Sequence, residues 1–106
     1  MVTLEDFKML DLRVGEVKSS ERVEGSDKLL RLLVDFGTES RQNLAGVGKK
    51  YQPEELLNKQ FVFVFNLESR TVMGFESQGM VLAAHNESGP ILIEPVEKVE
   101  NGNSLS

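Results

Sequence analysis

The segment 60–67, Gln-Phe-Val-Phe-Val-Phe-Asn-Leu, is the feature that most constrains the fold, because it is apolar on both faces of an extended chain. Three phenylalanines would point to one side and two valines to the other: Phe61, Phe63 and Phe65, and Val62 and Val64. A strand that is apolar on both faces is buried on both faces. One face can belong to the core, and the other must be covered by a helix, a loop or another subunit.

Around this segment, alternating sequences bounded by turn residues predict further strands and little helix. The predicted strands cover residues 11–17, 29–36, 41–47, 78–84 and 90–94. The second of them has one continuous apolar face, formed by Leu30, Leu32, Val34 and Phe36. Thr3 is a candidate N-cap of a short first helix, and Pro53 begins a second helical segment of one or two turns.

The resulting order is strand, strand, strand, short helix, strand, loop, strand, strand. It predicts an all-β fold: an OB-fold, a five-stranded Greek-key barrel with a short helix between strands 3 and 4 and short terminal additions. An SH3-like barrel is the main alternative, but it would not normally place a helix there. The length of 106 residues predicts a single domain over residues 1–106, with 66–77 as a long loop.

Composition excludes several classes of protein. The chain has no cysteine and a single histidine, His85, so it can form neither a disulfide nor a structural zinc site, and we expect no metal or other cofactor. No apolar run approaches the ~20 residues of a membrane helix. The N-terminus is acidic and lacks the basic and apolar regions of a signal peptide, which predicts a cytoplasmic protein.

The charge is negative overall but unevenly distributed. A net charge of −5 argues against a protein that coats nucleic acid by bulk charge. Residues 28–80 nevertheless contain seven basic and six acidic side chains, and residues 41–53 contain three basic side chains and no acidic one. A local basic site on an acidic body and a mixed solvated surface are both compatible with this pattern.

The motifs of catalysis are absent. The segment 46–50, Gly-Val-Gly-Lys-Lys, lacks the first glycine of a phosphate-binding P-loop, where Asn43 stands, and the hydroxyl residue after the lysine, where Lys50 stands. Ser77 is not in a nucleophile elbow, and nothing marks His85 as its base. We therefore predict no catalytic residue.

The remaining candidates suit RNA. Cations are available at Arg41, Lys49, Lys50 and Arg70, and hydrogen-bonding groups at Asn66, Ser77 and Gln78. In an OB-fold, ligands lie across strands 2 and 3 and between the first-to-second and fourth-to-fifth loops. Cations there can meet phosphates, and neutral polar groups can reach 2′-hydroxyls and base edges. Tyr51 is the one candidate for base stacking, and packing beside Pro53 is the alternative for its ring.

Several segments together resemble a known family. They occur in one order, as Asp11-Leu12-Arg13-Val14-Gly15, Asp27-Lys28-Leu29-Leu30, Val34-Asp35-Phe36-Gly37, Arg41-Gln42, Tyr51-Gln52-Pro53-Glu54-Glu55-Leu56, Asn66-Leu67, Met73-Gly74 and Ser77-Gln78-Gly79-Met80. The series is similar to the tRNA-binding domain at the C-terminus of many methionyl-tRNA synthetases, to free-standing structure-specific tRNA-binding proteins and to CsaA-type export chaperones. The resemblance implies an OB-fold homodimer that binds tRNA by shape and without catalysis, either free-standing or attached to an aminoacyl-tRNA synthetase.

The resemblance also implies a set of tRNA contacts. Carried over position by position, they are Lys28, Arg41, Lys49, Asn66, Arg70, Ser77 and Met80, and charge and adjacency add Lys50. After Asn-Leu this chain has Glu68 and Ser69 at two positions that are often basic in the family, which favours weak or auxiliary binding. The alternative function is a dimeric export chaperone that holds unfolded polypeptides.

Overall fold

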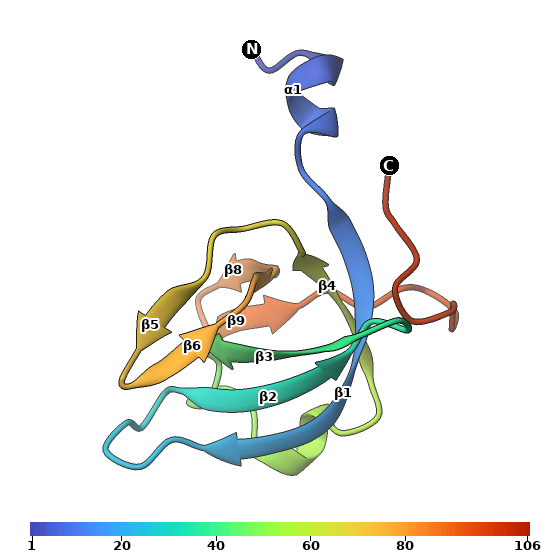
Figure 1. Ribbon diagram of the computed structural model, residues 1–106. Coiled ribbons are helices and arrows are strands. Elements are labelled where there is room, and N and C mark those ends of the chain that lie inside the picture. The colour runs from blue at the N-terminus through green and yellow to red at the C-terminus, as the bar shows by residue number, and fades with distance from the viewer.

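A computed structural model describes all 106 residues of the chain as a small β-structure with two short helices. The elements are α1 (Leu4–Lys8), β1 (Leu12–Arg22), β2 (Leu30–Asp35), β3 (Ser40–Ala45), the 3-10 helix η1 (Pro53–Leu56), β4 (Gln60–Val64), β5 (Arg70–Val72), β6 (Phe75–Ser77), β7 (Met80–Val81), β8 (Ala83–Asn86) and β9 (Gly89–Leu92). Figure 1 shows a strongly curved main sheet with the β5–β6 hairpin at one end.

The main sheet has five antiparallel strands in the order β3-β2-β1-β4-β7, with η1 between β3 and β4 in the chain. The backbone of β3 meets the start of β7 where the N–H of Gln78 donates to the carbonyl of Gln42 at 2.9 Å. The side-chain oxygen of Gln78 accepts the N–H of Gln42 at 3.2 Å. These bonds close the sheet into the OB-fold barrel that the element order predicts.

Strand β1 is longer than predicted. It was expected to end at residue 17, but it continues to Arg22 and pairs with β2 after an irregularity between Val17 and Ser19. The first half of the strand pairs with β4 instead. The alternation of side chains fails at the irregularity because the register shifts there, while backbone hydrogen bonds continue through polar residues.

The barrel core is the one that the sequence predicts. The apolar face of β2 is buried, with Leu30, Leu32 and Val34 at most 1% exposed. The ring of Phe36 meets those of Phe63 and Phe65 edge-on, at centroid distances of 5.3 and 5.0 Å. Such edge-to-face pairs add about 0.5–1.5 kcal/mol each beyond the area that they bury.

Strand β4 is buried on both faces within a single chain. Val62 and Val64, on the face opposite the phenylalanines, are each 6% exposed. Another subunit was one of the coverings that the sequence left open for this strand, but the chain itself already buries it, so the doubly apolar pattern is no evidence for a dimer. The C-terminal segment 99–106 contacts the start of β4, where the side-chain amide of Gln60 donates to the carbonyl of Val99 at 2.6 Å, and Figure 1 shows this segment returning beside β1.

The C-terminal segment is fixed by backbone and side-chain bonds. The N–H of Val14 donates to the carbonyl of Asn103 at 2.9 Å, and the N–H of Gly102 donates to the carbonyl of Val14 at 2.7 Å. The amide of Asn101 donates to the carboxylate of Glu16 at 3.0 Å, and Lys18 donates to the same carboxylate at 2.7 Å. These two hydrogen bonds, that of Lys18 first, hold the pKa of Glu16 below its usual value despite burial.

The segment expected to be a long loop, 66–77, contains a hairpin. Strands β5 and β6 pair with Arg70 opposite Ser77 and Val72 opposite Phe75. The turn between them has positive φ at both central residues, 49° at Met73 and 85° at Gly74, as a two-residue hairpin turn requires. The hairpin was not predicted from the sequence, because Met-Gly is a weaker signal of a hairpin turn than Asn-Gly.

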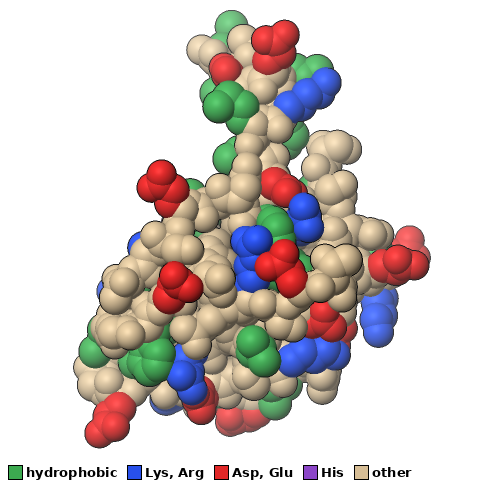
Figure 2. Space-filling model, viewed as in Figure 1, with side chains coloured by type: hydrophobic (Ala, Val, Ile, Leu, Met, Phe, Trp, Pro, Cys, Tyr) green, Lys and Arg blue, Asp and Glu red, His purple; other side chains and the backbone are tan.

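Helix α1 stands away from the barrel, as Figure 1 shows, and none of its residues is buried. Thr3 caps it as predicted: its hydroxyl accepts the N–H of Asp6 at 3.1 Å. Figure 2 shows hydrophobic side chains on this projection, and the exposed fractions are 67% for Leu4, 37% for Phe7 and 49% for Leu10. The apolar face of α1 therefore has no partner in this chain. A helix of only five residues is marginal alone in water.

Candidate nucleic-acid interface

A groove of about 310 Å³ opens between the end of β3 and the segment that carries β7 and β8. Its ten lining residues are Leu44, Ala45, Gly46, Val47, Arg70, Met80, Val81, Leu82, Ala83 and His85. Seven of them are hydrophobic, and none is acidic although the chain carries 17 acidic residues. Arg70 forms no ion pair with an acidic side chain within 4.0 Å, so its guanidinium is available to a ligand.

The β5–β6 hairpin brings Arg70 to this groove. The buried hydroxyl of Ser77, 0% exposed, accepts the N–H of Leu44 at 3.1 Å and donates to the carbonyl of Gly79 at 3.4 Å. Ser77 therefore joins β6 to β3 at the groove wall. Because Arg70 is the register partner of Ser77, the same bonds position Arg70 over the groove.

A second group of cations lies at the turn after β3. The N–H of Gly48 donates to the carbonyl of Lys28 at 2.7 Å, and the guanidinium of Arg22 donates to the carbonyl of Gly48 at 2.9 Å. A Cβ at Gly48 would lie 2.8 Å from the carbonyl oxygen of Lys28, so only glycine allows this approach. The turn thereby holds Lys28 beside the segment that carries Lys49 and Lys50.

These lysines are largely free for a ligand. The ammonium of Lys49 is 3.5 Å from the carboxylate of Asp27, but the two side chains are 70% and 80% exposed. An ion pair as exposed as this contributes little and is easily exchanged. The ammonium of Lys50 donates to the hydroxyl of Ser88 at 3.1 Å, in the turn of the β8–β9 hairpin. Lys50 therefore contacts the same hairpin that carries His85 to the groove.

Arg41 lies elsewhere and is occupied by contacts within the chain. Its guanidinium donates to the carbonyl of Phe65 at 2.6 Å and to Glu39 at 2.9 Å, and it stacks 3.5 Å from the centroid of the Phe65 ring. Arg13 also stacks on this ring, at 3.8 Å. The side chain of Arg41 is 21% exposed. Its contact with tRNA stays a prediction, and its visible contacts stabilise the fold.

Asn66 is also occupied. Its oxygen accepts the N–H of Asp11 at 2.9 Å, and its amide donates to the carbonyl of Met9 at 2.8 Å. It thus anchors the segment that leads from α1 to the barrel. Tyr51, the stacking candidate, packs against the core and accepts the N–H of Leu92 at 3.2 Å, which favours the packing alternative.

The eight predicted residues therefore fall into three places. Arg70 and Met80 line the groove with Ser77 beneath it, Lys28, Lys49 and Lys50 belong to the basic turn, and Arg41 and Asn66 lie towards α1. Sequence reasoning did not single out Arg22, which fixes the turn, or assign a role to His85, which lines the groove. A prediction that β1 continues beyond residue 17 would have placed Arg22 on a strand. The residues after 17 are mostly polar, however, and show no alternation that indicates a strand.

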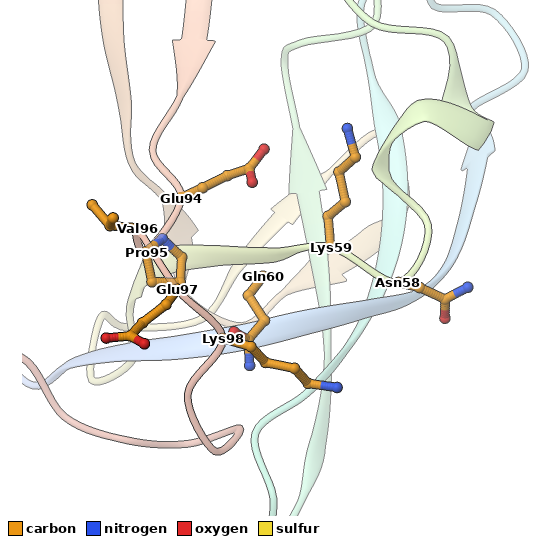
Figure 3. Close-up of a pocket in the computed structure, with 8 residues that line it drawn as sticks. All are labelled: Asn58, Lys59, Gln60, Glu94, Pro95, Val96, Glu97 and Lys98. Carbon is orange, nitrogen blue, oxygen red and sulfur yellow. The ribbon is translucent and has the colours of Figure 1, made fainter.

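A second cavity of about 280 Å³ differs in charge. It is lined by Asn58, Lys59, Gln60, Glu94, Pro95, Val96, Glu97 and Lys98, and Figure 3 shows side chains of both charges around it. Such a mixed lining offers an anion no advantage over water. No group of three or more His, Cys, Asp or Glu side chains is placed to hold a metal ion. None of the helices has the length and apolarity needed to cross a membrane.

A small antiparallel barrel with an acid-free groove and flanking cations has the architecture of a nucleic-acid-binding module. The chain belongs to the tRNA-binding domain family, since the family model described as "Putative tRNA binding domain" matches residues 12–104. This match confirms the family that the sequence resembles and the prediction of a binding module rather than an enzyme.

Known relatives include much longer proteins. The methionine–tRNA ligase of Caldanaerobacter subterraneus subsp. tengcongensis is 47% identical over 105 residues, which are 99% of this chain and 16% of the ligase. That of Methanothrix thermoacetophila is 50% identical over 102 residues, 96% of this chain and 15% of the ligase. The chain therefore spans about one sixth of the length of these curated relatives.

Solved structures include proteins of nearly the same extent. A MetRS related protein from Pyrococcus horikoshii superposes with a TM-score of 0.94 at 37% identity, covering 100% of this chain and 98% of that chain. The chaperone CsaA from Bacillus anthracis gives a TM-score of 0.91 at 36% identity, covering 100% and 99%. A protein related to MetRS and a CsaA chaperone thus share this fold.

Proposed function

We propose that the chain binds tRNA on the face formed by the groove and the basic turn, with Lys49, Lys50 and Arg70 as phosphate contacts. The observation that carries the proposal is the absence of any acidic side chain among the residues that line the groove, in a chain with a net charge of −5. Phosphate contacts from lysine and arginine supply most sequence-independent affinity for nucleic acids. A few such contacts on an acidic body fit weak or auxiliary binding of tRNA by its shape.

The proposed setting is a single domain that adds tRNA affinity to an aminoacyl-tRNA synthetase, as part of it or bound to it, in the cytoplasm. Support comes from the ligases that contain a matching segment. In this setting the domain contributes binding energy and the rest of the assembly performs the chemistry.

Arg70→Ala and Arg41→Ala should have different effects. Arg70→Ala removes one free cation, so the slope of log K for tRNA against log salt should flatten by about 0.9. Arg41→Ala deprives the Phe65 carbonyl of a donor and the Phe65 ring of a cation, so it should lower the free energy of unfolding by about 1–3 kcal/mol. Fluorescence titrations at several salt concentrations and urea denaturation measure the two quantities.

Lys59→Ala is the matched control, because it removes one exposed positive charge at the mixed cavity of Figure 3. It should change neither the salt slope nor the stability appreciably. An Arg70→Ala protein with an unchanged slope would remove Arg70 from the proposed site. A flattened slope in Arg41→Ala, with stability retained, would return Arg41 to it.

We also propose a homodimer in which α1 packs against a second copy of the chain. Support comes from the apolar side chains that α1 leaves exposed, together with Met9 at 73% exposed. Sedimentation at micromolar concentration should give about twice the mass of 11.8 kDa, and Phe7→Asp should shift the protein towards the monomer. A single 11.8 kDa species from the unmodified chain would refute the dimer.

The alternative function is that of an export chaperone, favoured by the apolar lining of the groove and by the likeness to CsaA. Competition between whole tRNA and an unfolded polypeptide at low and high salt separates the two functions. A tRNA-binding module should prefer tRNA at low salt and lose affinity as salt increases. Preference for the polypeptide that persists at high salt would favour the chaperone.

A further inference from the structure

We propose that the groove takes one unpaired nucleobase of the RNA, with Arg70 holding the adjoining phosphate. This inference rests on the proposed function and makes it more specific, because recognition by shape alone requires only backbone contacts. It adds a subsite for an extruded base to the cationic face.

The lining of the groove fits a planar, largely apolar group that carries a negative charge beside it. Leu44, Ala45 and Val47 form one wall, and each is packed into the core and at most 4% exposed. Met80, 37% exposed, and the segment 81–83 form the opposite wall. A volume of about 310 Å³ is at the lower end of the range of small-ligand sites, so it suits a single base rather than a folded element.

The groove also has polar side chains that can contact the phosphate and the base edge of a nucleotide. Arg70 and His85 are the only two lining residues with side chains that can donate hydrogen bonds, and both are exposed. A guanidinium can hold a phosphate by parallel hydrogen bonds or stack on a base. The ring nitrogens of His85 can meet a base edge. An unfolded polypeptide would gain nothing from the absence of acidic groups, so charge favours RNA as the occupant.

Gly46 provides a way to fill the groove without changing charge. It is exposed, lacks a positive φ, and a Cβ built there would have no neighbour within 4 Å. Gly46→Leu should therefore place an apolar side chain in the groove and leave the backbone unstrained. Ser40→Leu is the matched control, since it adds the same side chain at the other, exposed end of β3, where Ser40 makes no side-chain hydrogen bond.

The test uses two RNA duplexes with one bulged nucleotide each, identical except that the base of the bulge is present in one and removed in the other. Their phosphates are equal in number, so the ratio of the two dissociation constants isolates the base. Burial of the base against the apolar walls, with stacking on the guanidinium of Arg70, predicts that the unmodified chain binds the intact bulge at least about five-fold more tightly. Gly46→Leu should bring the ratio to about one, and Ser40→Leu should preserve it.

Equal affinity of the unmodified chain for the two duplexes would overturn the base site, whether or not Gly46→Leu folds. If tRNA bound more tightly than either duplex and with steep salt dependence, while the two duplexes bound with equal affinity, the proposed function would stand and only the base site would fail. If neither duplex nor tRNA bound, the proposed function itself would fail. A Gly46→Leu protein that lost affinity for an unfolded polypeptide but kept the RNA ratio would assign the groove to polypeptide instead.

Discussion

Replacement of Lys49, Lys50 and Arg70 together by alanine is expected to weaken tRNA binding about three-thousand-fold at 50 mM salt. Each phosphate contact contributes about 0.9 to the slope of log K against log salt, so three contacts contribute about 2.7. Such contacts contribute little at 1 M salt. The expected loss of affinity follows when this slope is applied between 1 M and 50 mM salt. Titration of labelled tRNA over a series of salt concentrations measures both the slope and the loss.

The effect must be separated from that of net charge. Lys8, Lys59 and Lys98 are exposed lysines that do not line the groove, and their joint replacement by alanine removes the same three charges. We expect this control to reduce tRNA affinity far less. At 0.1 M salt, screening weakens the attraction between a charge and a phosphate when they are more than about 10 Å apart. All six side chains lie outside the core, so both variants should retain the unfolding midpoint. Equal losses in the two variants would show that total charge, and not the groove face, controls binding.

Gly102→Ala is expected to have the largest effect on stability, a loss of at least about 2 kcal/mol in the free energy of unfolding. Gly102 has a φ of +92°, and a Cβ there would collide with the backbone carbonyl of Phe36. Its N–H also donates to Val14 in β1. The C-terminal segment would therefore have to leave β1 to accept the methyl group.

Gly46→Ala is the control for Gly102→Ala, because its Cβ meets no neighbour and its φ is not positive. It should leave stability within about 1 kcal/mol of the original or raise it slightly. Chemical denaturation of both variants gives the comparison. If Gly102→Ala were as stable as Gly46→Ala, the C-terminal segment would not lie where the structure has it.

The barrel could be predicted because its signals are local. Alternation along residues 29–36 and 60–67 identified the core faces, and the proline at position 53 marked the helix between strands. These patterns depend on the period of a strand and on backbone chemistry, which a sequence displays directly. Element ends were less accurate, since backbone pairing of β1 continues through polar side chains as far as Arg22.

The candidate site was only partly predictable, because residue type does not show what a side chain contacts. Arg41 and Arg70 look alike in sequence, yet one is held by Phe65 and Glu39 and the other is free beside the groove. The burial of Asn43 could not be read from its residue type either: its side chain is 1% exposed, and neither of its amide atoms has a hydrogen-bond partner. Long-range contacts decide such matters, and no local pattern encodes them.

The central claim is that a cationic face beside one groove recognises the shape of tRNA on a chain that is anionic overall. The most direct test compares whole tRNA with an isolated RNA hairpin that has the same number of phosphates, at matched salt. We expect tighter binding of tRNA than of the hairpin by the unmodified chain, and loss of that preference when Lys49, Lys50 and Arg70 are replaced together. Equal affinity for the two RNAs, or a preference that the triple variant keeps in full, would contradict it.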